Sequence, residues 1–338
     1  MNSYITSEDD FLALIAAKFP NKHNFLILGR GDDCAEIACP PQLAVSTDLF
    51  VEDVHFRRSY FSPFDIGYKA MAVNISDAAS AGSMPLGVSV GLTVPTPFPR
   101  NDAEGILDGM LHAAKEYAIA LTGGDLSKGD KLAFCVTIWG APVIPEGTPE
   151  KSAPRFLRRG PVTAGDKLFL CGVVGLARAG LLLLEERGPD AKAEAKFPAA
   201  RAAHLRPVPL VRAGMALASI PGCRLMDVSD GLARDLPRML RAYGANCGAD
   251  VTLARETLHP ETVAFAEEAG EDPVRFAFLG GEDYALLGAC PAGELAHAAE
   301  AVRKTGTPFL ELGTVTENPG IILNGSPLTD TGFDHFSL

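Results

Sequence analysis

The chain has 338 residues, of which 47% are hydrophobic, and its formal net charge is −12. The length favours two domains, and the apolar content excludes a disordered protein because it is enough to build packed cores. A surface this acidic repels nucleic-acid phosphate, which predicts no DNA or RNA partner, whereas phosphorylated small molecules remain compatible because bound divalent cations reverse the local charge.

The N-terminal segment and the cysteines predict a cytoplasmic protein with no membrane partner. Glu8, Asp9 and Asp10 precede a short apolar stretch, unlike the basic start of a secretory signal. No run reaches the roughly 18 apolar residues that a membrane span needs. The 7 cysteines are odd in number and no pair has CxxC spacing, so neither a disulfide framework nor a zinc site is indicated.

Hydrophobic periodicity predicts helices and strands in mixed order, an α/β or α+β fold. In chain order the first half is expected to contain a helix, two strands, a helix, a strand, a helix and a strand, at 8–19, 24–28, 43–46, 63–81, 88–94, 102–117 and 133–139. Five prolines then interrupt every pattern between Ala141 and Gly165. A strand and four helices are expected beyond them, at 167–171, 176–186, 208–219, 232–243 and 292–305. We therefore predict two domains, 1–145 and 146–338.

Aspartates recur in short phrases beside glycine, serine or threonine, each expected where a strand ends or a helix begins. The phrases are Gly31-Asp32-Asp33, Ser46-Thr47-Asp48, Ser76-Asp77, Gly123-Gly124-Asp125, Asp227-Val-Ser-Asp230-Gly231 and Gly280-Gly281-Glu282-Asp283. A single such phrase is more often a turn or a helix N-cap. As a set they predict a magnesium site, because Mg²⁺ prefers hard oxygen ligands and converging carboxylates repel one another unless a cation neutralises them.

Two of these phrases also repeat a pattern. Asn74-Ile-Ser-Asp77 and Asp227-Val-Ser-Asp230 both end an apolar stretch in Ser-Asp at the expected start of a helix, which fits a duplicated domain plan. Standard nucleotide motifs are absent: there is no Walker loop, and Gly29-Arg30-Gly31 is followed by acids rather than by the third glycine of a dinucleotide fingerprint. A nucleotide would therefore be held mainly through metal-bridged phosphates.

Together the phrases resemble the thiamine-monophosphate kinase family from about residue 25 to the C-terminus. The resemblance is carried by GDDCAEI (31–37), STDLFVEDVHF (46–56), YKAMAVNISDAASAG (68–82), TGGDLSKG (122–129), MDVSDGLARDL (226–236), FLGGEDYALL (278–287) and GFDHF (332–336). Single phrases are shared more loosely with the superfamily of aminoimidazole-ribotide synthetase, selenophosphate synthetase and the hydrogenase maturation factor that dehydrates carbamoyl groups.

This resemblance implies an enzyme that phosphorylates thiamine monophosphate with ATP to give thiamine diphosphate, by direct in-line transfer assisted by several Mg²⁺ ions. It implies a two-domain fold like that of aminoimidazole-ribotide synthetase, with ATP in a cleft between the domains. The N-terminal ATP- and metal-binding domain, 1–145, would pair its sheet in a homodimer. The C-terminal α/β domain, 146–338, would complete the active site.

The resemblance also implies roles for single residues, with no covalent catalytic residue among them. The magnesium ligands would be Asp33, Ser46, Thr47, Asp48, Asp77, Asp125, Asp227 and Asp230. The nucleotide would be contacted by Tyr117, Gly124, Asp125, Arg159 and Ser229. Thiamine monophosphate would be contacted by His55, Glu282 and Phe333. The register leaves Arg158 and Arg159 both eligible for the phosphate contact, with Arg159 favoured.

Other interpretations stay open. From the residues alone, His55 and Phe333 fit core packing, Glu282 and Asp283 fit a turn, and His23, His112, His204 and His259 fit surface or structural positions. The chain could be another superfamily enzyme, making aminoimidazole ribotide or phosphorylating selenide, although the absence of cysteine before Gly31 opposes the latter. A non-catalytic metal or nucleotide sensor would bind Mg-ATP without forming product.

Overall fold

The computed structural model describes residues 3–143, 156–188 and 195–329, and the chain divides into two compact units. Unit 1 comprises Met1–Ala78 and Met84–Pro142, and unit 2 comprises Ala79–Ser83 and Val143–Leu338. The predicted boundary between 145 and 146 falls in 144–155, outside the described residues.

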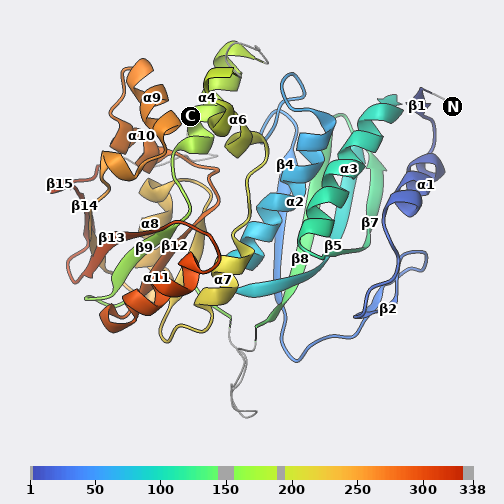
Figure 1. Ribbon diagram of the computed structural model, residues 1–338. Coiled ribbons are helices and arrows are strands. Elements are labelled where there is room, and N and C mark those ends of the chain that lie inside the picture. Colours follow the sequence, from blue (N-terminus) through green and yellow to red (C-terminus); the bar gives the residue numbers. More distant parts are fainter. Residues whose placement is uncertain (1–2, 144–155, 189–194, 330–338) are drawn as a thin grey trace. The chain divides into compact units, whose positions relative to one another are not determined.

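Unit 1 is built on a four-stranded sheet in the order β4-β8-β5-β7, with helices α2 and α3 against one face (Figure 1). Strands β4 and β8 are antiparallel, whereas β5 and β7 are parallel. The bounds are Ala44–Val51 (β4), Ser83–Val94 (β5), Ala120–Lys128 (β7), Ala133–Pro142 (β8), Pro63–Ser80 (α2) and Arg100–Glu116 (α3).

The alternation of side chains along β4 decides what each face of this sheet carries. Ser46, Asp48 and Phe50 are partly or fully buried, while Val45 and Leu49 are 63% and 61% exposed. Successive strand residues point to opposite faces, so the helix-covered face receives the polar pair and the other face receives the apolar residues. Helices α2 and α3 pack closely, because a Cβ on Gly109 would lie 2.0 Å from the Phe64 carbonyl oxygen.

Short N-terminal elements lie at the edge of unit 1 beyond β7 (Figure 1). They are β1 (Tyr4–Ile5), α1 (Glu8–Lys18), β2 (Leu26–Leu28), β3 (Glu36–Ile37) and β6 (Phe98–Pro99), with β1 paired to β6 and β2 to β3. The Ser7 side chain caps α1 by accepting from the Asp10 N–H, and Arg100 on α3 pairs with Asp10 at 2.8 Å. The cap and the ion pair together attach α1 to the main body of the unit.

Unit 2 contains a seven-stranded sheet in the order β10-β12-β9-β13-β11-β14-β15. Every pairing is antiparallel except that of β11 with β14. The strands are Lys167–Cys171 (β9), Arg224–Val228 (β10), Gly248–Val251 (β11), Ala285–Cys290 (β12), Phe309–Thr316 (β13), Gly320–Leu323 (β14) and Ser326–Pro327 (β15). Its main core packs sheet residues such as Leu168 and Leu287 against Leu236 and Phe278 from helices. The mixed α/β prediction is confirmed, and this antiparallel sheet is of the α+β kind.

The helices of unit 2 include one group, α4, α6 and α9, that packs together around a second apolar cluster containing Leu183, Phe197, Phe265 and Phe276. The α-helices are Leu176–Arg187 (α4), Pro198–Leu205 (α6), Val211–Leu217 (α7), Leu232–Leu240 (α8), Pro260–Glu268 (α9), Pro273–Leu279 (α10) and Leu295–Arg303 (α11). In the described part of the unit, 3₁₀ turns lie at Ala242–Gly244, Arg255–Thr257 and Ala292–Glu294. Within the described ranges, no helix is both long and apolar enough to cross a membrane.

Three predicted positions of acidic phrases are wrong. Asp48 and Asp125 lie inside β4 and β7, not at strand ends. Asp77 lies in the last turn of α2, whereas Asp230 precedes α8, so the repeated Ser-Asp pattern does not correspond to repeated secondary structure. For Asp48 and Asp125 the reason is tertiary, because pairing with β8 and with β5 extends the strands through aspartates, whose intrinsic strand propensity is low.

Candidate active site

A pair of carboxylates lies beneath the helices of unit 1, where β4 passes under the end of α2. The Ser46 hydroxyl donates to Asp77 Oδ2 at 2.5 Å. The pKa of Asp48 is raised to about 6, mainly by burial and to a smaller extent by the charge of Asp77 and a hydrogen bond with Asp77. Two acids this close favour sharing one proton, or a cation in its place. Carboxylate and hydroxyl oxygens are hard ligands of the kind Mg²⁺ prefers, so this donor set fits magnesium.

Thr47 lies between the two polar residues in sequence but on the other face of the sheet. Its hydroxyl oxygen is 2.9 Å from that of Thr137 on β8. The period-two alternation of a strand imposes this separation. The structure therefore brings the side chains of Ser46, Asp48 and Asp77 together and leaves the side chain of Thr47 outside the group.

Two further acidic phrases of unit 1 are exposed. Asp125 follows Gly124 on β7 and pairs with Gly91 on β5. Gly124 has a φ of +156°, and a Cβ there would lie 2.0 Å from the Val90 carbonyl oxygen, so the position admits only glycine. Asp33 is on the loop between β2 and β3, where its N–H donates to Asp32 Oδ1 at 2.8 Å. Both carboxylates are open to solvent and to ligands.

His55 and Tyr117 are partly buried members of unit 1. The His55 Nδ1 accepts from the Val51 N–H at 3.1 Å, and its ring centroid is 6.0 Å from that of Phe50. The local turn thus engages Nδ1 and, with the Phe50 contact, fixes the orientation of the ring. Tyr117 ends α3 as its C-cap residue.

In unit 2 two predicted phrases form adjacent loops. The Glu282 N–H donates to the Ser229 carbonyl at 2.7 Å, and the Tyr284 N–H donates to the Val228 carbonyl at 3.0 Å. Glu282 and Tyr284 have φ values of +63° and +50°, in the left-handed region that side chains rarely adopt. Strained residues of this kind persist only where the surroundings over-determine them, and they cluster at functional sites.

Asp230 is held from two directions by residues of α8. Its N–H donates to the fully buried Asp235 at 2.9 Å. Arg238 Nη1 donates both to Asp230, at 2.6 Å, and to Asp235, at 2.7 Å, while Arg234 Nε is 3.6 Å from Asp230. Asp235 thus fixes both the backbone and, through Arg238, the carboxylate of Asp230. Sequence analysis did not identify Asp235 or Arg238, although an acid at the start of a helix after Ser-Asp-Gly was a detectable signal.

Glu282 and Asp283 are neighbours with different partners. Glu282 Oε2 is 3.0 Å from Nδ1 of the buried His204 on α6. Asp283 accepts from the N–H groups of Gly175 and Ala177, at 2.6 and 2.8 Å, at the start of α4. Burial raises the pKa of Asp283 to about 7 against the lowering effect of these backbone N–H groups. The contact with Glu282 links His204 to the candidate site, and no sequence signal indicated it because the two residues are far apart in the chain.

The remaining predicted residues of unit 2 are less defined. Asp227 is partly buried on β10, opposite Leu286 of β12. Arg158 and Arg159 are both exposed, and the Arg158 carbonyl accepts from the Leu225 N–H at 2.9 Å. Phe333 lies outside the described residues. Across 3–143, 156–188 and 195–329, no group of three or more acidic, histidine or cysteine side chains stands ready to hold a metal ion.

Comparison with known proteins places this geometry in a family. Residues 31–141 match the family model "AIR synthase related protein, N-terminal domain". The thiamine-monophosphate kinase of Escherichia coli K12 is 35% identical over 320 residues, which cover 92% of each protein. That of Haemophilus influenzae is 33% identical over 321 residues, covering 91% of this chain and 92% of the relative.

Solved structures agree with the sequence relatives. The thiamine-monophosphate kinase of Stenotrophomonas maltophilia superposes with a TM-score of 0.77 at 28% identity, covering 95% of this chain and 96% of that one. AaThiL complexed with AMPPCP and TMP superposes with a TM-score of 0.74 at 27% identity, covering 97% of both chains. HypE of E. coli, at 23% identity and a TM-score of 0.73, shares the fold. The extent and identity of these matches show that the chain belongs to the thiamine-monophosphate kinase family.

Proposed function

We propose that this protein transfers the γ-phosphoryl group of ATP to thiamine monophosphate, in one in-line step, to give thiamine diphosphate. The observation that carries the proposal is the near full-length match to thiamine-monophosphate kinases at 33–35% identity. The similar AaThiL structure holds AMPPCP and TMP, which supports a nucleotide and a thiamine phosphate as ligands of this fold. Within the chain itself, support comes from Asp48 and Asp77, whose mutual repulsion favours a bound cation.

Magnesium would be held in unit 1 by Ser46, Asp48 and Asp77, together with the exposed Asp33 and Asp125. Thr47 would contribute only a main-chain oxygen, because its side chain is on the opposite face of the sheet. In unit 2 we assign the same kind of role to Asp227 and Asp230. Bound Mg²⁺ would neutralise phosphate charge on both substrates, which is the main electrostatic obstacle to joining two anions.

The protein residues bind and orient the substrates in this proposal. Gly124 would contact the nucleotide through its main chain, and the strand itself requires glycine there because the Val90 carbonyl of β5 occupies the place of a Cβ. Arg159 is exposed and would pair with a nucleotide phosphate, and Tyr117 and Ser229 would contact the nucleotide. His55, Glu282 and Phe333 would contact thiamine monophosphate.

No residue needs to remove a proton from the acceptor or to form a covalent intermediate. The attacking atom is a phosphate oxygen that is already anionic at neutral pH, so a general base would add little. Catalysis then consists of alignment and charge stabilisation, as in other phosphoryl transfers.

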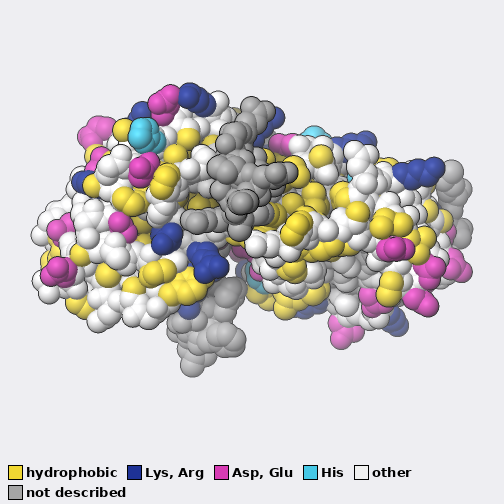
Figure 2. All heavy atoms as spheres, turned by 90° about the horizontal axis from the view of Figure 1, so that it is seen from below, with side chains coloured by type: hydrophobic (Ala, Val, Ile, Leu, Met, Phe, Trp, Pro, Cys, Tyr) yellow, Lys and Arg dark blue, Asp and Glu magenta, His cyan; other side chains and the backbone are white. Residues whose placement is uncertain are grey.

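We further propose that two copies of unit 1 associate through the open face of its sheet, which is the face that α2 and α3 do not cover. Eight of the ten large hydrophobic side chains most exposed in the described parts of the chain belong to unit 1, and two of them, Val45 and Leu49, lie on this face. Figure 2 shows hydrophobic side chains spread over the visible surface of unit 1, on the right. Exposed apolar surface of this kind is typical of a protein interface.

One assay distinguishes the candidate functions. The protein is incubated with Mg-ATP and thiamine monophosphate, and thiamine diphosphate is measured by chromatography. Formation of thiamine diphosphate supports the proposal, and its absence under conditions where Mg-ATP binds would favour a sensor. ATP hydrolysis that depends on the precursor of aminoimidazole ribotide would favour that synthetase activity. Asp48→Ala and Asp230→Ala should lower turnover by orders of magnitude while circular dichroism stays unchanged, and near-normal rates in both would refute the metal roles.

A further inference from the structure

Arg30 is a positively charged residue at the start of the acidic loop Gly31–Asp33, and nothing in the proposed reaction accounts for it. Its guanidinium group is directed at main-chain oxygens. Nη2 donates to the Phe19 carbonyl at 2.8 Å, and Nη1 donates to the carbonyl of Leu121. One side chain thereby connects the end of α1, the loop and strand β7.

The backbone of Arg30 is fixed as well. The Arg30 N–H donates to Asn21 Oδ1 at 2.7 Å, and Asn21 Nδ2 donates back to the Arg30 carbonyl at 2.8 Å. The Asn21 side chain lies so close that a Cβ on Gly29 would be 2.2 Å from Asn21 Oδ1. Four hydrogen bonds therefore hold a single residue, two through its main chain and two through its guanidinium group.

The hydrogen bonds of Arg30 offset the desolvation cost of burying its guanidinium group. Burial lowers the pKa of the Arg30 guanidinium, which means that the fold disfavours its charge at this position. A partly buried guanidinium is retained where its fixed set of N–H donors meets matched acceptors, as the carbonyls of Phe19 and Leu121 provide here. Because burying this charge costs free energy, we infer that the connection from Arg30 to β7 has a role in holding the loop.

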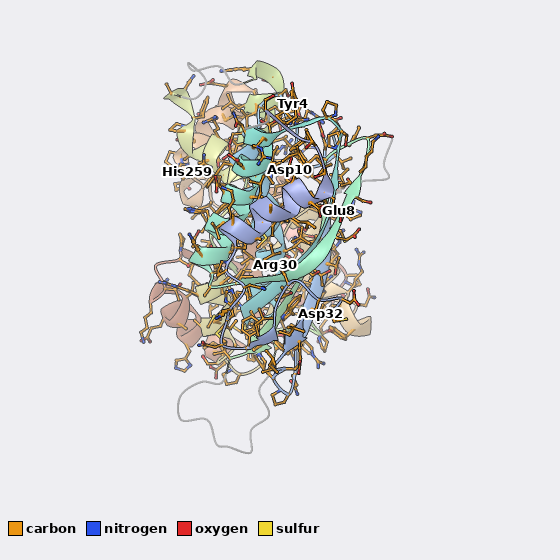
Figure 3. The ribbon with its side chains drawn as sticks, turned by 90° about the vertical axis from the view of Figure 1, so that its right-hand side faces the viewer. Tyr4, Glu8, Asp10, Arg30, Asp32 and His259 are labelled. Atoms are coloured by element: carbon orange, nitrogen blue, oxygen red, sulfur yellow. The ribbon has the colours of Figure 1, made fainter. Side chains whose placement is uncertain are left out.

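The two ends of the connection both lie next to proposed ligands. Arg30 directly precedes Asp32 and Asp33, while Leu121 is on the strand that continues to Gly124 and Asp125. In Figure 3, Arg30 lies below α1, and Asp32 is seen farther along the loop. Without this connection the exposed loop could move away from β7, because the negative charges of Asp32 and Asp33 are repelled by that of Asp125 on the strand.

We propose that Arg30 is a positioning residue, which holds the acidic loop Gly31–Asp33 against β7 so that Asp33 and Asp125 act on the same magnesium-bound phosphates. This inference rests on the proposed function, since it assumes that both aspartates serve magnesium. Asn21 is the second part of the device, because it fixes the main chain from which the Arg30 side chain extends.

The test compares Arg30→Met and Asn21→Ala with the wild-type protein in two measurements. Hydrogen–deuterium exchange of 26–38 reports loop order directly, and titration with Mg²⁺ alone reports metal affinity. We expect faster exchange in this segment and about ten-fold weaker Mg²⁺ binding in both variants, the size typical of losing a group that orients a ligand. Arg30→Lys should recover part of the loss, because an ammonium group still donates to carbonyl oxygens.

A matched control is Arg100→Met. Arg100 is also a partly buried arginine of unit 1, and it fastens the N-terminal segment through its ion pair with Asp10 on α1. It should leave exchange of 26–38 and Mg²⁺ affinity unchanged. The direction of the change is informative too, because removing a nearby positive charge by itself would tighten Mg²⁺ binding. Tighter binding, or unchanged exchange in both Arg30→Met and Asn21→Ala, would overturn the proposal.

Two outcomes separate this inference from the function on which it rests. If Asp33→Asn binds Mg²⁺ as the wild type does, the metal role of the loop fails and the positioning proposal fails with it, even where exchange at 26–38 responds to Arg30→Met. If Asp33→Asn loses Mg²⁺ affinity and Arg30→Met does not, the metal role stands and only the positioning role of Arg30 is refuted. Should Arg30→Met fold poorly, Asn21→Ala decides alone, because Asn21 is exposed and its truncation leaves no buried group unpaired.

Discussion

Asp48 shows at the scale of one residue how the fold of unit 1 favours ligand binding over stability. Its carboxyl is partly buried beside Asp77, and its pKa is raised to about 6 from an ordinary 3.8. Near neutral pH the metal-free protein therefore holds two negative charges together in a poorly solvated place. Such destabilised acids are typical of binding sites, because a cation relieves the repulsion.

The sign of the pH dependence follows from this shift. Between about pH 4 and pH 6 the folded protein keeps a proton on Asp48 that the unfolded chain has released, so stability falls as the pH rises through this window. We expect Asp48→Asn to raise the Tm of the metal-free protein at pH 8 by about 2–4 °C for each kcal/mol gained, and to change it little near pH 4. Differential scanning calorimetry at both values measures this.

Magnesium provides the complementary observation on the same variant. Mg²⁺ should raise the Tm of the wild type, because a ligand that binds only the folded state stabilises it, and this increase should be much smaller in Asp48→Asn. Asp250→Asn, an exposed acid on β11, serves as the control and should behave as the wild type. A variant that is less stable than the wild type at pH 8 would contradict the repulsion between Asp48 and Asp77.

At the scale of elements, α4 begins where a loop from a distant part of the chain supplies its cap. Gly175 precedes the helix and has no capping side chain of its own. Asp283 replaces it by accepting from the N–H groups of Gly175 and Ala177. A carboxylate at a helix N-terminus satisfies unpaired N–H groups and complements the helix dipole. The same contact fixes the loop that carries Glu282.

This dual role predicts a combined defect in Asp283→Ala. Loss of the cap should lower the free energy of unfolding by about 1–2 kcal/mol, measured in urea, with partial recovery in Asp283→Asn. The KM for thiamine monophosphate should rise because Glu282 is no longer held. Asp272→Ala, which removes the cap of α10, provides the comparison, since it should lower stability without changing that KM. An unchanged KM in Asp283→Ala would show that the capping contact of Asp283 does not affect binding of thiamine monophosphate.

The open face of the unit 1 sheet gives a second prediction at this scale. Leu49→Arg places a charge among exposed apolar residues, so it should convert the proposed dimer to a monomer, with a halved mass in light scattering after gel filtration. Leu12→Arg changes an equally apolar residue that is 44% exposed on α1, away from that face, and should leave the mass unaltered. A wild type that is already monomeric at micromolar concentration would refute the dimer.

Sequence reasoning predicted elements better than it predicted the surroundings of site residues. Amphipathic or apolar runs such as 8–19 and 167–171 match α1 and β9 because their periodicity is local. The position of Asp48 in mid-strand and the side-chain orientation of Thr47 depend on pairing with β8, which is tertiary. The contacts of Glu282 with His204, of Asp230 with Arg238 and of Arg30 with Leu121 have no local pattern, so only the structure could provide them.

At the scale of the whole molecule, each unit carries its own set of proposed magnesium ligands, represented by Asp48 in unit 1 and Asp230 in unit 2. If both sets serve one phosphoryl transfer, removing either should disable the same step. Groups that act as one catalytic unit show strongly non-additive effects, because the second loss removes little that the first has left.

A double-mutant cycle tests this. Asp48→Ala and Asp230→Ala should each lower kcat by about 100- to 1,000-fold, and the double variant should fall little further than the worse single variant. The control cycle pairs Asp48→Ala with Asp272→Ala, whose effect on the cap of α10 should simply multiply with that of Asp48→Ala. Rates of thiamine diphosphate formation measure both cycles. If the effects of Asp48→Ala and Asp230→Ala also multiply in full, the two acidic sets contribute independently to the barrier, and their action as one catalytic unit is excluded.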